Sequence, residues 1–193
     1  MSFRITGLVA GLVLAAQGVS AGANEFEPQL RALAAGDLAR IAAAPVILDA
    51  LRAQNAAHAG LSQADVEALD AKWRAEVGAG NSPLIDGVID HAASAWLRDM
   101  KEEMGGLITE VFVVDAKGLN VAQSDVTSDY WQGDEDKWKL TYAKSADTVQ
   151  MGEVELDEST QAYQSQVSFP INDPDTGDPL GTVTVGVNLE QLQ

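Results

Sequence analysis

Hydrophobic positions in the first half of the chain recur at the spacing of α-helices. Between residues 27 and 104, leucine, isoleucine and valine return every three or four positions, with charged residues between them. Such a stripe forms the buried side of an amphipathic helix. We therefore predict a helical region over residues 24–106.

Helix-breaking and capping residues divide this region. Pro45 removes a backbone donor and clashes with the preceding turn, which predicts a kink or a restart. Ser62 and Asp65 have the spacing of a capping box that begins a second helix. Ser82 and Pro83 predict a third helix, with serine as the N-cap and proline at the first helical position, and this helix is expected to run to about residue 104.

After Gly106 the hydrophobic period changes from 3.6 to 2, which is typical of strands. A turn is predicted at 115–118, and a short helix from about 134 to 144. Helices followed by antiparallel hairpins indicate an α+β domain, with the N-terminal helices packed on one face of a five-stranded antiparallel sheet. The predicted strands are 107–115, 119–125, 152–157, 161–171 and 180–189.

Aromatic residues gather between positions 111 and 142, although they make up only 6% of the chain. Such enrichment indicates either the main core or a binding pocket. Both interpretations remain open for the side chains concerned, which are Phe112, Tyr130, Trp131, Trp138 and Tyr142.

The charge of the chain narrows the classes of partner. Its formal net charge is −17, which repels phosphate backbones and anionic lipid headgroups. A basic protein or a cationic small molecule is favoured instead. The chain has no cysteine, and no motif of a known catalytic or cofactor site stands in a suitable context, so we expect neither enzymatic activity nor a cofactor.

Metal binding is not expected either. Asp173, Asp175 and Asp178 are clustered carboxylates, but their spacing departs from a calcium loop and fits a hairpin turn better. His58 and His91 lie on separate helical segments, and nothing in the sequence pairs them as ligands.

The first residues have the pattern of a secretory signal peptide. Arg4 precedes about a dozen mostly apolar residues, and small residues follow, so cleavage is expected near Ala21 or Ala23. An uncleaved anchor is the alternative. We therefore expect a signal peptide over 1–23 and a periplasmic or secreted single domain over 24–193, with a helical part at 24–106 and a sheet part at 107–193.

Four segments in order resemble a known family. They are PVILDA at 45–50 with Gln54 and Asn55, VFVVDAKG at 111–118, the aspartate-aromatic pair at 129–130, and PLGTVTVGV at 179–187. Together they are similar to the extracytoplasmic Cache sensor fold, also called the PDC sensor domain. The resemblance implies a PAS-like sheet whose concave face holds a small ligand under the connection that follows the second strand.

This chain departs from the family at one position. Members often carry an arginine in that connection, which grips a ligand carboxylate; here the nearest cation is Lys137, which lacks the guanidinium fork. Aromatic faces beside aspartates favour a cationic or amine ligand instead. The ligand-binding residues expected from the resemblance are Ser124, Asp129, Tyr130, Trp131, Lys137, Trp138 and Tyr142.

Two functions follow as hypotheses. The first is an exported small-molecule-binding sensor domain that acts in signal transduction through a separate membrane or periplasmic partner, because most such domains are fused to a membrane helix and this one is not expected to be. The second is an accessory subunit with the same fold, which binds a protein partner through its acidic surface and binds no small ligand.

Overall fold

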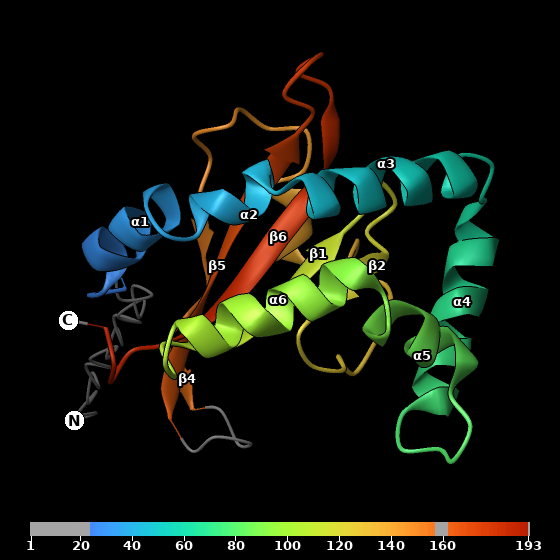
Figure 1. Ribbon diagram of the computed structural model, residues 1–193, viewed down its shortest axis with the longest axis horizontal. Helices are drawn as coiled ribbons and strands as arrows, with labels where there is room; N and C mark the ends of the chain where they lie inside the picture. Colours follow the sequence, from blue (N-terminus) through green and yellow to red (C-terminus); the bar gives the residue numbers. More distant parts are fainter. Residues whose placement is uncertain (1–23, 157–161, 193) are drawn as a thin grey trace, which may run out of the picture.

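The computed structural model describes residues 24–156 and 162–192, so the expected signal peptide lies outside the described residues (Figure 1). The helices are α1 (Glu27–Ala35), α2 (Ala39–Ala43), α3 (Pro45–His58), α4 (Gln63–Glu76), α5 (Pro83–Ile89), α6 (Ala92–Glu103) and α7 (Asp136–Lys139). The strands are β1 (Ile108–Val114), β2 (Asn120–Gln123), β3 (Gln150–Met151), β4 (Glu155–Leu156), β5 (Tyr163–Asn172) and β6 (Pro179–Asn188).

Two of the predicted helix boundaries are confirmed. Ala44 is extended, and Pro45 begins α3 at its first turn, where the missing N–H costs no hydrogen bond. The side chain of Ser62 accepts a hydrogen bond from Asp65 N, and the Asp65 carboxylate accepts one from Ser62 N. This reciprocal pair is the predicted capping box at the start of α4.

The third predicted helix differs from the structure in two ways. Ser82 makes no capping bond to the backbone of α5, because the Glu76 carboxylate accepts from Leu84 N and Ile85 N instead. The helix is also broken in two, since His91 is extended and its side chain accepts from the backbone of α6. A residue from the preceding helix and a histidine cap supply these bonds, and neither is part of the usual capping signature.

The predicted α+β class is confirmed. All strand pairs are antiparallel, and the sheet has the order β2-β1-β6-β5-β3, with β4 also paired to β5. It contains six strands, because the predicted third strand, 152–157, is reduced to the two residues of β4, and β3 forms just before it. The predicted helix after residue 134 is shortened to the four residues of α7.

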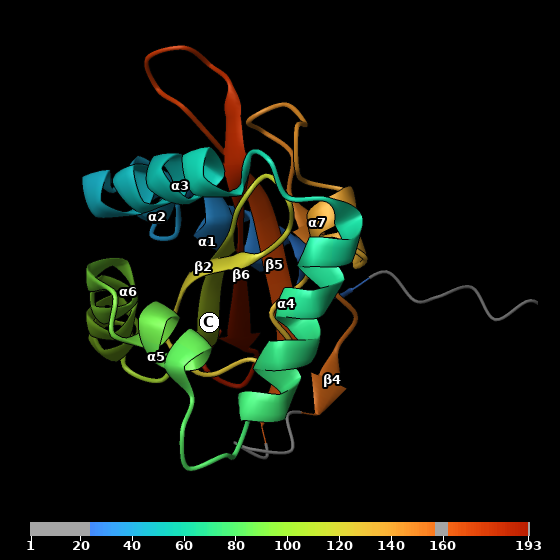
Figure 2. The ribbon, with the colours of Figure 1, turned by 90° about the vertical axis from the view of Figure 1, so that its right-hand side faces the viewer.

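The helices lie on both sides of the sheet. Helices α1, α2, α3 and α6 cover one face, where their apolar residues form the main core with the inward side chains of β1, β5 and β6 (Figures 1 and 2). A smaller core gathers around Trp73 of α4 and Tyr130 of the connection between β2 and β3. Within the described residues, no helix combines the length and the hydrophobicity needed to cross a membrane.

The acidic loop between β5 and β6 is a hairpin turn held by α3. Arg52 Nε and Nη2 donate to the two carboxylate oxygens of Asp173, at 2.8 and 2.9 Å. These hydrogen bonds lower the pKa of Asp173 to about 2. The hairpin predicted for this loop is therefore confirmed, and both Asp173 oxygens already have a cationic partner within the protein.

The low pKa of Asp173 predicts a pH-dependent stability. A carboxylate with a depressed pKa contributes stability that is present above its unfolded pKa, near 4, and is lost as the pH falls through about 2. We expect the melting temperature of the wild type to fall more steeply between pH 4 and pH 2 than that of Asp173→Asn. Asp99→Asn is the control, because Asp99 is exposed on α6 and has no ion pair within the described residues. Parallel curves for the wild type and Asp173→Asn would contradict the prediction.

Candidate functional site

The turn between β1 and β2 is organised by the fully buried carboxylate of Asp115. Its Oδ1 accepts from the backbone N–H groups of Lys117 and Leu119, at 2.8 and 3.0 Å. Its Oδ2 meets two side chains of α3, Gln54 Nε2 at 3.0 Å and His58 Nδ1 at 2.7 Å. One carboxylate therefore closes the predicted turn and ties it to α3.

The connection between β2 and β3 is anchored to the same turn. The indole N–H groups of Trp138 and Trp131 donate to the carbonyl oxygens of Asp115 and Lys117, at 3.2 and 3.0 Å. The two backbones pass so close that a Cβ on Gly118 would overlap the Cα of Gly133, and Gly118 also has a positive φ of 81°. Only glycine fits this crossing.

Helix α4 fixes the position of the connection at Tyr130 and Trp131 through hydrogen bonds and aromatic stacking. The Asp70 carboxylate, itself bonded to Arg74, accepts from the backbone N–H groups of Tyr130 and Trp131, at 2.9 and 3.1 Å. The rings of Trp73 and Tyr130 stack with centroids 5.1 Å apart. The position of the connection is therefore set jointly by the turn and by α4.

The sheet has one apolar and one polar face, since successive strand residues point to opposite sides. The connection, with α7, covers the face opposite α2, α3 and α6 (Figure 2). Two rows of cross-strand partners cross this covered face, which we call the polar face. The first row is Gln123, Phe112, Thr184, Ser168 and Gln150, and the second is Asn120, Val114, Thr182 and Pro170.

Buried polar atoms without a partner gather on the polar face and in the connection over it. Among the described residues, each buried side-chain nitrogen or oxygen that lacks a hydrogen bond belongs to one of these two places. Such atoms are rare in folded proteins and mark a place where a ligand or ordered water completes the hydrogen bonding. They are Asn120 Oδ1, Gln123 Nε2, Gln132 Oε1, Gln150 Oε1 and Thr182 Oγ1.

The hydrogen bonds that do form orient the amides. The NH2 groups of Asn120, Gln132 and Gln150 donate to protein oxygens, which leaves their carbonyl oxygens unpaired. Gln123 is the reverse case, because its Oε1 accepts from Thr127 and its NH2 group is unpaired. The polar face and the connection together therefore present three acceptors, one amide donor and one hydroxyl.

Lys137 is a cation that lies over this arrangement. Its ammonium is 5.1 Å from the ring centroid of Phe112, the second residue of the first row, and pairs with Glu135 at 2.9 Å. This places a predicted ligand residue directly over the polar face.

Three other predicted ligand residues, Tyr130, Trp138 and Tyr142, are stacked aromatic side chains of the connection. Trp138 and Tyr142 stack with centroids 4.8 Å apart. Burial, with a smaller effect of the Asp115 charge, raises the pKa of Tyr130 and of Tyr142, so both hydroxyls stay protonated at neutral pH.

The side chains of the remaining predicted ligand residues, Ser124, Asp129 and Trp131, make hydrogen bonds or packing contacts within the protein. Ser124 Oγ accepts from Val111 N and donates to Asp125. Asp129 accepts from Gln132 and lies 3.6 Å from Arg74. Trp131 packs on the smaller core and does not belong to the two rows.

Sequence reasoning missed the amide and hydroxyl residues of the polar face. A signal for them exists in the segment TVTV at 182–185, where threonine and valine alternate in a strand buried on both sides. Alternation of this kind normally indicates a solvent-exposed face. It indicates a polar interior only once the connection is known to cover it.

Comparison with known proteins finds similarity at the level of solved structures. No model of a known protein family matches the chain, and no curated protein matches it significantly. The ligand-binding domain of the Campylobacter jejuni chemoreceptor Tlp3, in complex with 4-methylisoleucine, is 16% identical over 87% of this chain and 62% of its own, with a TM-score of 0.40. The sensor domain of the Vibrio cholerae histidine kinase DctB is 16% identical over 87% and 59%, with a TM-score of 0.37.

A third solved structure is of the same kind. The ligand-binding domain of the Pseudomonas fluorescens chemoreceptor CtaA, in complex with L-alanine, is 15% identical over 52% of this chain and 43% of its own, with a TM-score of 0.38. The chain thus spans about 40 to 60% of the length of these sensor domains. All three TM-scores lie below 0.5.

The anchoring role of Asp70 predicts a loss of stability. Asp70→Ala leaves the buried backbone N–H of Tyr130 and the partly buried N–H of Trp131 without an acceptor. A buried group left unpaired costs about 1–3 kcal/mol, so we expect the free energy of unfolding to fall by about that amount in urea denaturation. Glu67→Ala is the matched control on the exposed side of α4, with an expected change within about 0.5 kcal/mol. Equal stability of the two variants would show that Asp70 does not hold the connection.

Proposed function

We propose that the protein is an exported sensor domain, which binds a small polar molecule between the polar face and the connection and acts through a separate protein partner. The proposal is one of binding without catalysis. It rests on a single observation, the set of five buried polar atoms without partners on that face and in the connection above it.

The unpaired polar atoms of this face reduce the stability of the ligand-free protein. Each unpaired buried polar group costs about 1–3 kcal/mol of folding free energy. A ligand that pairs with these atoms recovers the cost, and the fold holds them in place before binding. Polar groups of this kind also give a site its specificity.

The hydrogen-bonding pattern supports a ligand rich in donors. The three unpaired carbonyl oxygens can accept hydrogen bonds from N–H or O–H groups of a ligand. The Gln123 amide and the Thr182 hydroxyl can donate hydrogen bonds to an acceptor atom of the same ligand. No arginine takes part in the polar rows, and Lys137 is already paired with Glu135. A small amine that also carries a carbonyl or hydroxyl group fits this set.

The connection offers a route from ligand to partner. It is tied through Trp138 to the Asp115 turn, and that turn is tied to α3 through Gln54 and His58. A ligand that repositions the connection therefore acts on a helix of the opposite face. We propose α3 as the element that transmits the bound state.

The localisation in this proposal follows from the sequence. The pattern of residues 1–23 supports export with cleavage near Ala21 or Ala23. Action through a separate partner is part of the same proposal.

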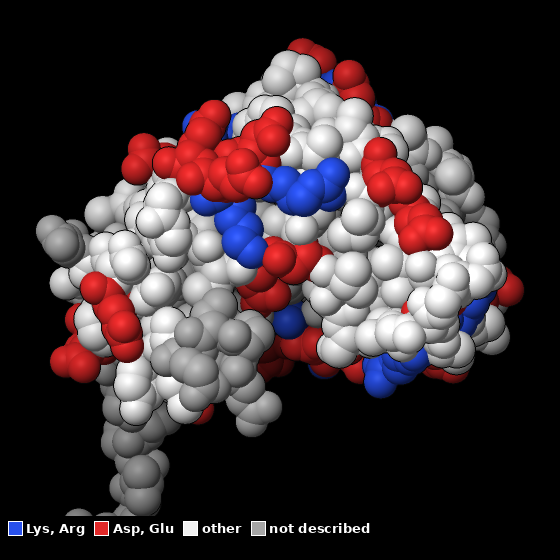
Figure 3. All heavy atoms as spheres, turned by 60° about the horizontal axis from the view of Figure 1, so that its bottom comes forward, with Lys and Arg blue, Asp and Glu red and all other residues white. Residues whose placement is uncertain are grey.

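A second candidate function is supported by the surface. Val154, Leu156 and Tyr163 are exposed apolar residues on and beside β4, and Val154 and Tyr163 line a hollow that also contains Glu25 and Glu190. Figure 3 shows further Asp and Glu side chains in several groups across one face of the molecule. An apolar patch with an acidic rim fits a basic, apolar segment of a partner protein.

The two functions differ in their salt dependence. Docking through acidic side chains weakens steeply between 50 and about 500 mM salt, because surface charges are screened, whereas a small ligand in a covered site is affected little. Titration of a purified partner at several salt concentrations therefore measures how much of the interaction belongs to the acidic surface.

A matched pair of threonines tests the ligand site. Thr182 and Thr184 both lie on β6, and both side chains are buried on the polar face. Of the two hydroxyls, only that of Thr184 has a hydrogen-bond partner among the described residues, Ser168 Oγ at 2.9 Å. We expect Thr182→Val to leave the ligand-free protein as stable as the wild type or up to about 1 kcal/mol more stable. Thr184→Val should lose about 1–3 kcal/mol, because it leaves Ser168 unpaired.

Binding is measured by thermal shift over a panel of small amines, amino acids and organic acids. A compound present at 100 times its dissociation constant should stabilise the wild type by about 2.7 kcal/mol. Thr182→Val should bind that compound about tenfold more weakly, equivalent to about 1.4 kcal/mol. A panel without any stabilising compound, or equal binding by Thr182→Val, would count against the proposed function.

A further inference from the structure

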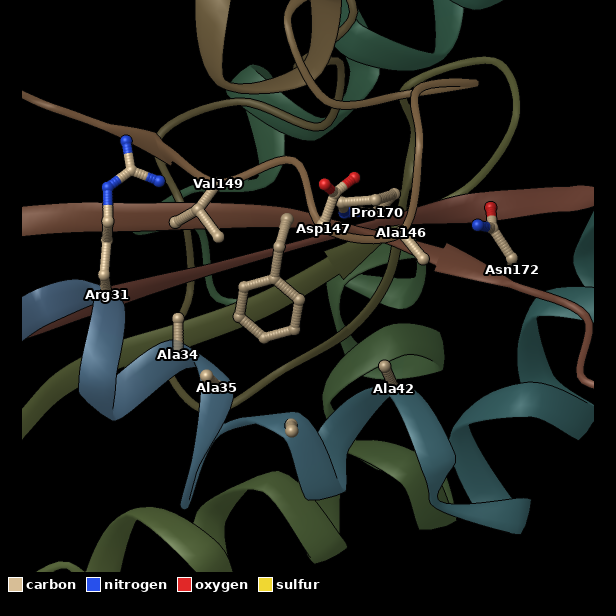
Figure 4. A pocket seen from close by; sticks show the side chains of 11 residues that line it. Arg31, Ala34, Ala35, Ala42, Ala146, Asp147, Val149, Pro170 and Asn172 are labelled. Carbon is tan, nitrogen blue, oxygen red and sulfur yellow. The ribbon is translucent and has the colours of Figure 1, made fainter.

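A separate crevice lies on the helical side of the sheet, away from the polar face. It has a volume of about 470 Å³ and runs between helices α1 and α2 on one side and β5 with residues 146–149 on the other (Figure 4). This volume is within the range of small-molecule sites in proteins. Phe169 points into the crevice, and its neighbour Ser168 belongs to the polar face, as strand alternation requires. Pro170, at the end of the second polar row, borders both places.

The interior of the crevice is apolar. Phe169 and Val149 line it on the side of the sheet. Helices α1 and α2 contribute four alanines, whose single methyl groups leave the space open and expose only hydrocarbon. These are Ala34, Ala35, Ala39 and Ala42.

The two charged residues of the crevice are not equivalent. Arg31 is neutralised by Glu27 on its own helix, with nitrogen–oxygen distances of 2.8 and 2.9 Å. Asp147 has no ion pair within the described residues. A hydrogen bond from the Ser145 side chain, together with a backbone bond, lowers the pKa of Asp147, so it carries a full negative charge at neutral pH.

We infer that this crevice binds an organic amine with an aromatic or bulky aliphatic body. The body covers Phe169 and the alanine methyl groups, and the ammonium pairs with the free Asp147 carboxylate. The net charge of −17 raises the local concentration of cations around the whole protein and favours the same class of ligand. This inference does not rest on the proposed function, because it uses Phe169, Asp147 and the alanines of α1 and α2, none of which belongs to the polar rows.

Three probes with one body test the charge preference. They are 3-phenylpropylamine, 3-phenylpropanol and 3-phenylpropanoate, and their dissociation constants are measured by chemical-shift titration of the 15N-labelled protein. We expect the amine to bind about twofold to fivefold more tightly than the alcohol, as for a solvent-exposed ion pair, and the carboxylate to bind more weakly than both. Shifts should gather at residues 34–42 and 146–149. Tightest binding by the carboxylate, or shifts elsewhere, would overturn the inference.

Matched variants localise the binding. Ala39 and Ala43 are both exposed on α2, but only Ala39 lines the crevice. Ala39→Leu should abolish the amine-induced shifts by filling the space, whereas Ala43→Leu should bind as the wild type does. Asp147→Asn should reduce the affinity for the amine to that for the alcohol, about twofold to fivefold, and leave the alcohol unchanged.

One further variant separates the crevice from the polar face. Thr182→Val changes a side chain that does not line the crevice, so this variant should bind 3-phenylpropylamine there as the wild type does. Unchanged amine binding by Ala39→Leu, or its loss in Thr182→Val, would show that the amine is not held in the crevice.

Discussion

The hydrogen bonds around the buried carboxylate of Asp115 are the interactions on which the arrangement of the molecule depends. The carboxylate accepts hydrogen bonds from two backbone N–H groups of its own turn and contacts two side chains of α3. The backbone carbonyl oxygen of Asp115 accepts a hydrogen bond from the indole N–H of Trp138. A charge without exposure to water is tolerated only when hydrogen bonds surround it in this way. The same hydrogen bonds tie α3 and the connection to the turn, although the three elements are separated in the sequence.

The division of the sheet into two faces follows from strand alternation and from what covers each side. The valines of β1 and β6 meet the helices and build the main core. Their neighbours Thr182, Thr184 and Gln123 are as deeply buried, yet they face the connection. Because the connection hydrogen-bonds only part of this face, the structure keeps buried polar atoms without partners between the sheet and the connection. The alanine-lined crevice lies beside Phe169, on the side of the sheet that α1 and α2 cover.

Much of the fold was predictable from local patterns. The capping box at Ser62, the restart at Pro45 and the turn at Gly118 each depend on residues close in sequence, and each was predicted correctly. The break at His91 and the Glu76 cap were not, because one depends on an unusual capping side chain and the other on a residue from the neighbouring helix. Among the candidate site residues, Lys137 does lie over the polar face, whereas Ser124 is bonded by the protein itself.

By itself the sequence determined the α+β class, the acidic character and the aromatic enrichment of the connection, since these depend on composition and on the period of the hydrophobic residues. Only the tertiary structure decided which polar residues are buried without partners. Asn120, Gln123 and Thr182 are ordinary polar residues of a strand until the connection between β2 and β3 covers them. Hydrogen bonding is a property of pairs of groups, and those pairs are set by the packing of the whole chain.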